Sequence, residues 1–419
     1  MRLLFVVPYV PTLIRVRPYN LVRFLARHGH RLTLATLWET DEERRALAEF
    51  ESLGVEVVAA PLTRNRKLLN LIAALPSARP LQANFCWQPE LAAKLDALVS
   101  ERDFDAIHVE HLRGSRYALQ LKRRTQDARR KTQNVRRKTP IIWDSVDSIT
   151  HLFEQAARRS QSTKGKLMTT FELPRTRRHE GWLAAQFDHV LVTSPTDRAA
   201  LEAISPHHVP ITVLPNGVDL SYFAPCEGAP REPDALVFSG KMSYHANITA
   251  ALHLVNDIMP QVWAHKPHTQ LWIVGKDPPD EVRALEARHP GRVEVTGAVP
   301  DMRTYLRCAA VAVVPVVYGA GIQNKVLEAM ACATPVVTSA QTVASLQPGY
   351  EQAALVADSA EAFAHHVLRL LNDPSLRARL GAAGRRYVEM HHDWNVIVDR
   401  LAGIYEEAMH QTQGARRKT

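Results

Sequence analysis

The stretch that decides the fold is residues 315–335, which reads PVVYGAGIQNKVLEAMACATP. The apolar run at residues 311–316 predicts a buried strand that leads into it. Gly319 and Gly321 permit a tight turn, and a helix is expected to begin near Ile322. A strand, a glycine turn and a helix in this order present free backbone N–H groups and the positive end of a helix dipole. The stretch therefore predicts a site for a diphosphate.

Two side chains of this helix carry opposite charges on one face. Lys325 and Glu328 are three residues apart, so they are neighbours on the helix surface. Lys325 would neutralise phosphate charge, and the Glu328 carboxylate would accept hydrogen bonds from two ribose hydroxyls. The alternative is an ordinary surface ion pair that contributes only about 0.2–0.5 kcal/mol.

Similar apolar runs recur along the whole chain, with helical patterns between many of them. They lie at residues 3–7, 32–37, 55–60, 106–109, 141–143, 190–193 and 211–214 in the first half, and at 236–239, 270–274, 293–296, 311–316, 335–338 and 354–357 in the second. This alternation predicts an α/β protein with two doubly wound parallel sheets, each with helices on both faces. Ligands of such sheets bind at the carboxyl ends of the strands, so two of them facing each other would form a cleft.

A break in composition divides the two halves. Residues 220–234 contain three prolines and a glycine, which is typical of a linker. The expected organisation is an N-terminal domain at residues 1–219, a linker at 220–234, a C-terminal domain at 235–390, and a final segment at 391–419. That segment is expected to be helical to Met409 and to end in a disordered basic tail.

The net charge of +9 is concentrated in a short insert and the tail. Residues 122–139 read KRRTQDARRKTQNVRRKT, with nine Lys or Arg and one Asp, and residues 416–418 add three more basic residues. The rest of the chain is close to neutral, so the distributed basic surface of a nucleic-acid-binding protein is not expected. The basic insert is either a solvated loop or a contact with anionic lipid, where each basic residue contributes about 1 kcal/mol.

Other residue types argue against a metal site, disulfides and a membrane span. The four cysteines are far apart in sequence, and neither they nor the nineteen histidines have metal-ligand spacing. We therefore expect free thiols, no metal and no cofactor. No apolar run reaches the roughly 18 residues of a spanning helix. The expected location is the cytoplasm, with peripheral attachment to the inner face of the plasma membrane if the basic insert contacts lipid.

Residues 319–337, GAGIQNKVLEAMACATPVV, resemble the donor-binding helix of the retaining glycosyltransferases of family four, the group 1 glycosyl transferases of the GT-B fold. Three further stretches are similar to motifs of that family: LPNGVD at 214–219, FSGKM at 238–242 and VEVTGAVPDMRTYLR at 293–307. The resemblance implies two Rossmann-like domains facing each other across a cleft, with the last helix returning to the first domain.

The resemblance also implies roles for single residues of the second half. Glu328 matches the family's ribose-binding glutamate, and Gly240 matches a turn that lets the backbone approach the diphosphate. Lys241 stands where the family commonly has arginine, and its alternative is an exposed turn residue. Val299 would touch the nucleotide base, with ordinary packing as its alternative.

The departing diphosphate would be stabilised by Lys325, Lys241 and the helix start at Gly321 and Ile322. One departure from the family pattern concerns Ala320, which stands where the family has a glutamate that holds the transferred sugar. This difference leaves the identity of the donor sugar open.

The first half offers candidates for the acceptor side. Asp144 and Asp147 follow the strand at residues 141–143, where a carboxylate could position the acceptor hydroxyl or bind the donor sugar. Their alternative is helix capping. Arg17, just before the first helix, would bind a phosphorylated acceptor or the diphosphate. Its alternative is a solvated arginine at a helix start.

The resemblance thus implies a retaining, metal-independent transfer from a nucleotide-diphosphate sugar to an acceptor hydroxyl, in the synthesis of cell-surface polysaccharide or glycoconjugate. Both UDP and GDP are open as the nucleotide, and the acceptor is a carbohydrate, a lipid-linked sugar or a small molecule. Two alternatives remain: a nucleotide-sugar epimerase of the same architecture, and a non-catalytic nucleotide-binding relative, which Ala320 motivates.

Overall fold

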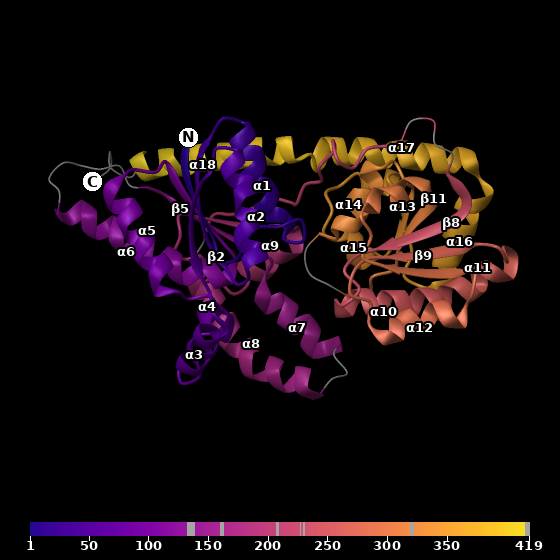
Figure 1. The fold of residues 1–419 in the computed structure, drawn as a ribbon, viewed down its shortest axis with the longest axis horizontal. Coiled ribbons are helices and arrows are strands. Elements are labelled where there is room, and N and C mark those ends of the chain that lie inside the picture. The colour runs from indigo at the N-terminus through magenta and orange to yellow at the C-terminus, as the bar shows by residue number, and fades with distance from the viewer. Residues whose placement is uncertain are drawn as a thin grey trace. The chain divides into compact units, whose positions relative to one another are not determined.

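The computed structural model describes residues 1–131, 139–159, 163–206, 209–226, 228, 231–318 and 322–414. The chain forms two compact units, each built around its own sheet (Figure 1). The first comprises Met1–Pro215 and Val398–Thr419, and the second comprises Asn216–Ile397. Gly319, Ala320 and Gly321 lie outside the described residues.

The sheet of the first unit is entirely parallel, with the strand order β3-β2-β1-β4-β5-β6-β7. Its strands are β1 (Arg2–Val7), β2 (Arg31–Trp38), β3 (Glu56–Pro61), β4 (Ala106–Glu110), β5 (Ile141–Val146), β6 (His189–Val192) and β7 (Ile211–Val213). Each apolar run that the sequence singled out in this half is a strand here. Central strand β1 has an almost wholly buried apolar run because neighbouring strands pair with both of its edges.

Helices between these strands, together with the C-terminal helix, supply the rest of the first core. They are α1 (Val16–Arg27), α2 (Asp41–Ser52), α3 (Arg64–Ala74), α4 (Leu81–Phe85), α5 (Pro89–Glu101), α6 (His111–Lys131), α7 (Ile149–Arg159), α8 (Thr163–Ala184), α9 (Pro195–Glu202) and α18 (Trp394–Gly414). Leu91 and Leu95 of α5 and Tyr117 and Leu121 of α6 join a cluster of buried apolar side chains on the sheet.

The first part of the basic insert is helical, so the solvated-loop alternative is wrong for residues 122–131. Residues 122–131 continue helix α6, whose earlier turns are anchored by the buried Tyr117 and Leu121. Lysine, arginine, glutamine and alanine have high helix propensity, so an anchored helix extends readily through such a sequence. Residues 132–138 of the insert lie outside the described residues.

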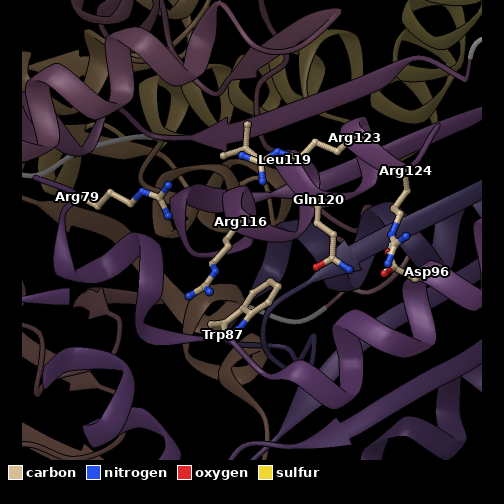
Figure 2. A pocket seen from close by; sticks show the side chains of 8 residues that line it. All are labelled: Arg79, Trp87, Asp96, Arg116, Leu119, Gln120, Arg123 and Arg124. Carbon is tan, nitrogen blue, oxygen red and sulfur yellow. Dashed lines mark hydrogen bonds and ion pairs between the residues drawn. The ribbon is translucent and has the colours of Figure 1, made fainter. Parts of the chain in front are cut away.

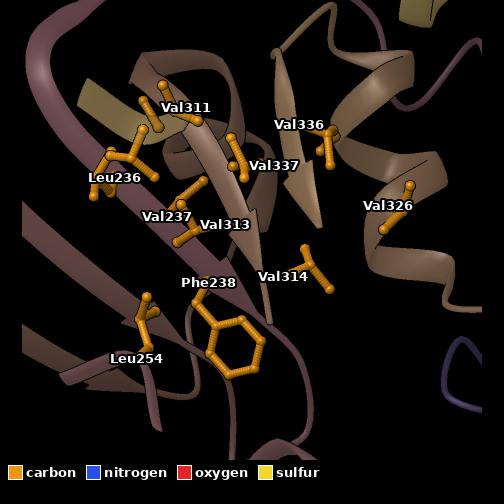
Figure 3. Close-up of a cluster of buried hydrophobic side chains, with 14 of the residues drawn as sticks. Leu236, Val237, Phe238, Leu254, Val311, Val313, Val314, Val326, Val336 and Val337 are labelled. Atoms are coloured by element: carbon orange, nitrogen blue, oxygen red, sulfur yellow. The ribbon is translucent and has the colours of Figure 1, made fainter. Parts of the chain in front are cut away.

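The second unit contains another parallel sheet, with the strand order β10-β9-β8-β11-β12-β13. Its strands are β8 (Glu232–Ser239), β9 (Gln270–Val274), β10 (Val293–Gly297), β11 (Ala309–Val314), β12 (Val336–Thr338) and β13 (Ala354–Val356). Val311 and Val313 of β11 are fully buried, as is Phe238 at the end of β8 (Figure 3). The predicted α/β class with two doubly wound sheets is confirmed. The predicted linker is too long, because Glu232 already pairs with Ala309 of β11.

The helices of the second unit position the turn regions at the ends of its strands. They are α10 (His245–His253), η1 (Leu254–Ile258), α11 (Met259–His265), α12 (Asp280–Arg288), α13 (Met302–Cys308), α14 (Asn324–Ala331), α15 (Ala340–Val343), η2 (Tyr350–Gln352), α16 (Ala360–Asn372) and α17 (Pro374–His391). Helix α14 begins two residues after the predicted start at Ile322. Gly381 of α17 lets the chain just after α14 approach, since a Cβ there would lie 2.2 Å from the Ala333 carbonyl oxygen.

The C-terminal segment is more ordered than we expected. Helix α18 continues to Gly414, five residues past Met409, so the predicted disorder is wrong for this part. Residues 415–419 lie outside the described residues. In the first unit, the Tyr405 hydroxyl on α18 lies 2.8 Å from His108 Nδ1 in a buried contact. None of the helices in the described ranges combines the length and apolarity needed to cross a bilayer.

Candidate functional site

The carboxyl ends of β8, β9 and β10 form a set of interlocked turns in the second unit. Gly240 N donates to the Val274 carbonyl at 3.0 Å, and Gly275 N donates to the Gly297 carbonyl at 3.1 Å. Gly240 and Gly275 have φ values of +149° and +151°, which side chains other than glycine rarely adopt. A Cβ on Gly275 would lie 1.7 Å from the Gly240 carbonyl oxygen. Glycine is therefore required where these two turns touch.

A lysine from helix α14 reaches this turn. Lys325 Nζ donates to Asn247 Oδ1 at 3.0 Å and to Gln323 Oε1 at 3.1 Å. Asn247 in turn donates from Nδ2 to the Lys241 carbonyl at 2.9 Å and is almost fully buried. A Cβ on Gly240 would lie 3.1 Å from Lys325 Cε. The ammonium group is thus held beside the Gly240 turn by two neutral amides, which leaves its charge uncompensated by them.

Burial perturbs both charged groups of helix α14. Burial lowers the pKa of Lys325 to about 8, although the negative charge of Glu328 acts to raise it. Burial also raises the pKa of Glu328 to about 7, although the positive charge of Lys325 acts to lower it. No salt bridge joins the two side chains within the described part of the chain. The alternative interpretation, a simple surface ion pair between Lys325 and Glu328, is therefore wrong. Buried ionisable groups with such perturbed pKa values are common at functional sites.

The remaining donor-side candidates of the second half lie around this turn region or in its core. Lys241 is exposed, and its carbonyl accepts the hydrogen bond from Asn247. Val299, in the loop after β10, is half-buried and packs against the core. Ile322 is buried just before α14. Gly319 and Gly321 lie outside the described residues, so the structure does not describe the predicted turn itself.

Sequence reasoning missed Asn247 and an aromatic pair near the same turn. The His245 ring stacks on the Tyr318 ring with centroids 5.3 Å apart and an angle of 13°. His245 Nδ1 and Thr249 Oγ1 lie 3.0 and 3.1 Å from the Tyr318 hydroxyl. The available signal was the polar and aromatic stretch at residues 244–247, directly after the glycine turn. Such flat rings and amides are groups that recognise nucleosides and sugars.

In the first unit, Arg17 and Asp144 form a buried ion pair at the carboxyl end of β5. Arg17 Nε lies 2.7 Å from Asp144 Oδ2, and both side chains are at most 3% exposed. Arg17 Nη1 also donates to the Leu214 carbonyl at 2.9 Å, and His108 Nε2 lies 3.4 Å from Asp144 Oδ2. Burial alone would raise the pKa of Asp144, but Arg17 and His108 lower it below its usual value. The alternative of a solvated arginine is therefore wrong for Arg17. Its ion pair with Asp144 connects the first helix to the sheet.

Asp147 directly follows strand β5 and does not cap a helix. Its Oδ1 accepts a hydrogen bond from Thr193 Oγ1 at 3.2 Å. The first amides of α7, Ile149 N among them, donate to the buried Glu180 carboxylate instead. Burial and the charge of Asp197 raise the pKa of Asp147 to about 7. The capping alternative is therefore wrong for Asp147, and its raised pKa means that this carboxyl group gains a proton more readily than an exposed aspartate does.

Glu110 and His111, which sequence reasoning missed, lie at the end of neighbouring strand β4. Glu110 Oε1 accepts a hydrogen bond from the Tyr9 hydroxyl at 2.6 Å. Burial and the charge of Asp144 raise the pKa of Glu110 to about 8. His111 has φ +63°, and burial lowers its pKa to about 3. A positive φ in a non-glycine residue is uncommon and concentrates at functional sites. The signal was the pair of polar residues directly after an apolar strand.

The two sets of groups suit different tasks. The turn region of the second unit offers a cation, backbone N–H groups and aromatic rings, which fit a nucleotide and its phosphates. The first unit offers two buried carboxyl groups with raised pKa values, Glu110 and Asp147, which can exchange hydrogen bonds with hydroxyl groups.

Family comparisons match both units. A family model described as Glycosyl transferase 4-like domain matches residues 14–217, and one described as Glycosyl transferases group 1 matches residues 233–373. Together they span most of the chain and contain each of the described candidate residues.

Curated relatives are similar over much of their length. The chain is 24% identical to a phosphatidyl-myo-inositol mannosyltransferase of Mycolicibacterium smegmatis over 362 residues, which cover 83% of this chain and 84% of that protein. It is 27% identical to a GDP-mannose-dependent monoacylated alpha-(1-6)-phosphatidylinositol monomannoside mannosyltransferase of Corynebacterium glutamicum over 278 residues, 60% of this chain and 70% of that protein.

Solved structures share the fold at low sequence identity. Sucrose-phosphate synthase from Thermosynechococcus elongatus superposes with a TM-score of 0.65 and 18% identity, covering 98% of this chain and 100% of that one. Anabaena HepE in complex with UDP and glucose gives a TM-score of 0.65 and 14% identity, covering 97% of this chain and 100% of that one.

Proposed function

This chain belongs to the GT-B glycosyltransferases, with the 4-like domain in its first half and the group 1 domain in its second. From that premise we propose that it transfers a hexose from a nucleotide-diphosphate sugar to an acceptor hydroxyl, with retention of configuration and without a divalent metal. The synthesis of a cell-surface glycoconjugate is the proposed context.

The observation that carries this proposal is the position of Lys325. Its ammonium is held by Asn247 and Gln323 beside the Gly240 turn, and both of these partners are neutral. A diphosphate bound at this turn would meet a fixed positive charge without displacing a protein carboxylate. Stabilisation of charge on a leaving group by such a fixed cation is a large catalytic contribution. This argument supports a transfer in which no metal ion has to neutralise the diphosphate.

Other donor groups would be bound around this centre. Glu328, one turn further along α14, is half-buried and would accept hydrogen bonds from the ribose hydroxyls. The exposed Lys241 would add a second positive charge. The departing phosphate would accept the acceptor's proton, so no side-chain nucleophile is required.

The relatives suggest which substrates to test first. Two of them are named as mannosyltransferases that act on phosphatidylinositol lipids, and one is named as GDP-mannose-dependent. We therefore propose GDP-mannose as the first donor and a lipid-linked acceptor at the inner face of the plasma membrane. Glu110 and Asp147 of the first unit would position the acceptor hydroxyl.

A thermal-shift panel of GDP, UDP and their sugars tests the donor site. A true donor at a hundredfold excess over its Kd should stabilise the protein by about 2.7 kcal/mol. Glu328→Ala should raise the donor Kd and sharply reduce turnover, whereas the matched change Glu361→Ala at an exposed position on α16 should do neither. Unchanged donor binding in Glu328→Ala would remove this residue from the proposed site.

Product analysis separates the proposal from its two alternatives. A nucleotide-sugar epimerase would convert the donor with no acceptor present. A non-catalytic relative would bind nucleotide but show neither hydrolysis nor transfer across a panel of acceptors. The anomeric configuration of a transferred sugar, read by NMR, tests retention, and activity in excess EDTA tests the independence from metal.

A further inference from the structure

A separate basic cavity lies in the helical layer of the first unit. It measures about 430 Å³ and is lined chiefly by the loop before α4, the residue Trp87 after α4, and helices α5 and α6 (Figure 2). None of the candidate residues at the carboxyl ends of β4 and β5 lines it. Its volume falls within the roughly 300–1,000 Å³ of small-molecule sites.

The charges around this cavity are strongly unbalanced. Four arginines line it, and the lining contains one carboxylate, Asp96. Arg124 Nε lies 2.9 Å from Asp96 Oδ2, so this pair is neutral overall. In the described part of the chain, the guanidinium groups of Arg79, Arg116 and Arg123 have no carboxylate partner. Three positive charges therefore line one cavity without a carboxylate partner among the described side chains.

Arg116 is held in a fixed orientation. Its guanidinium carbon lies 3.9 Å from the centroid of the Trp87 ring, and Nη1 donates to Asn84 Oδ1 at 3.4 Å. Burial, and then the repulsion from Arg79, lower the pKa of Arg116. A stacked guanidinium keeps its planar donor edge oriented, which suits bidentate binding of a phosphate group. The protein thus holds a partly desolvated cation close enough to a second cation, Arg79, to be repelled by it.

We propose that this cavity binds a phosphate-bearing anion through Arg79, Arg116 and Arg123. Figure 2 shows Arg79 approaching from one side, with Arg116 and Arg123 projecting from α6. The cavity is larger than inorganic phosphate requires, so the ligand is a phosphorylated polar group, either on a soluble molecule or on the headgroup of an anionic lipid. This site is distinct from the diphosphate site proposed for the second unit and does not depend on it.

Isothermal titration with inorganic pyrophosphate tests the site in a Lys325→Ala background, which removes the cation of the proposed donor site. Arg116→Ala and Arg79→Ala should each weaken binding by at least about tenfold, the equivalent of one charge-assisted hydrogen bond. Arg45→Ala removes the same charge from an exposed position on α2 and should leave binding unchanged. If all three variants weakened pyrophosphate binding equally, the effect would come from the net charge of the protein and not from this cavity, and the proposal would be overturned.

A gain of affinity provides a test that loss of folding cannot imitate. Asp96→Asn removes the carboxylate that neutralises Arg124 and raises the positive charge of the cavity. Pyrophosphate should bind several-fold more tightly to this variant, with a steeper dependence on salt. Unchanged or weaker binding to a folded Asp96→Asn protein would contradict the proposal.

Vesicles distinguish the two sources of phosphate. The full chain should be sedimented with phosphatidylcholine vesicles, with and without phosphatidylinositol. Binding that requires phosphatidylinositol and falls in Arg79→Ala and Arg116→Ala would identify a lipid headgroup, while pyrophosphate binding alone would identify a soluble ligand. If neither probe responds to these two substitutions, the cavity is not an anion site.

Discussion

Lys325 illustrates how a single side chain acquires its properties from its surroundings. On an exposed helix its ammonium would stay charged well above neutral pH, but burial lowers its pKa to about 8. Its hydrogen bonds go to the amide oxygens of Asn247 and Gln323, which fix its position without neutralising it. The group is therefore positively charged at neutral pH and becomes neutral only slightly above it.

This pKa predicts a pH dependence for nucleotide binding. A bound diphosphate favours the charged ammonium, so the pKa of Lys325 is higher in the complex than in the free protein. Binding must then take up a proton above pH 8, and the Kd of a nucleoside diphosphate should rise by up to about tenfold per pH unit there. The nucleotide phosphate, with a pKa of about 6, is fully ionised in this range.

The measurement is a titration of the nucleotide between about pH 7 and pH 9.5, on both sides of the Lys325 pKa. Lys325→Arg should abolish the weakening at high pH, because a guanidinium remains protonated throughout. Lys94→Arg, an exposed control on α5, should keep it. A Kd that is flat with pH in the wild-type protein would show that Lys325 does not contact the phosphates.

The turns at the ends of β8 and β9 show what element packing demands of the chain. Gly240 and Gly275 bring two backbone segments into contact, and the resulting bonds align the ends of neighbouring strands. Met242 N continues the contact by donating to the Lys276 carbonyl at 2.9 Å. The position of Lys325 beside Gly240 depends on this contact, so the shape of the candidate site is set by these elements and not by its charged residues alone.

Gly275→Ala should therefore disrupt the second unit. Its φ of +151° is strained for alanine, and the new methyl group would lie 1.7 Å from a carbonyl oxygen that cannot move freely. We expect a loss of more than about 3 kcal/mol in the free energy of unfolding. Chemical denaturation measures it.

The matched control is Gly403→Ala in helix α18. A Cβ there meets no atom within 4 Å, and alanine favours the helix, so this variant should be more stable by about 0.5–1 kcal/mol. If Gly275→Ala were as stable as the wild-type protein, the two turns would not be in contact in solution.

At the scale of the whole molecule, the chain contains two separate hydrophobic cores. One surrounds β11 in the second unit, with Val311 and Val313 at its centre, and the other surrounds β1 and β4 in the first, with Val6 and Val109. Each core has its own parallel sheet and its own set of helices. Two such cores can unfold separately, so a ligand bound by one unit does not necessarily stabilise the other.

Hydrogen exchange should reveal this separation. A nucleotide at a hundredfold excess over its Kd should slow exchange about a hundredfold for core amides of β8, β9 and β11, because these exchange through unfolding of the second unit. Core amides of β1 and β4 should keep their rates. Equal slowing in both units would show that the chain unfolds as one cooperative body.

The sequence by itself determined the class of fold, the positions of the strands and the family. Buried parallel strands are continuous apolar runs, so each could be read from a few neighbouring residues. The same holds for Lys325 and Glu328, whose spacing places them on one face of a helix. The wrong expectations concerned segments without such a pattern: the basic run that extends α6, and the residues after Met409 that extend α18.

Only the tertiary structure decided which polar groups meet. Asn247 bonds Lys325 from 78 positions away, and Arg17 pairs with Asp144 across 127 positions. The cavity between α5 and α6 gathers arginines that look solvated when read one at a time. Local patterns report how deeply a segment is buried, but the partner of a buried polar group is chosen by packing. Because a buried charge or amide is costly without a partner, such pairings fix the site only once the chain has folded.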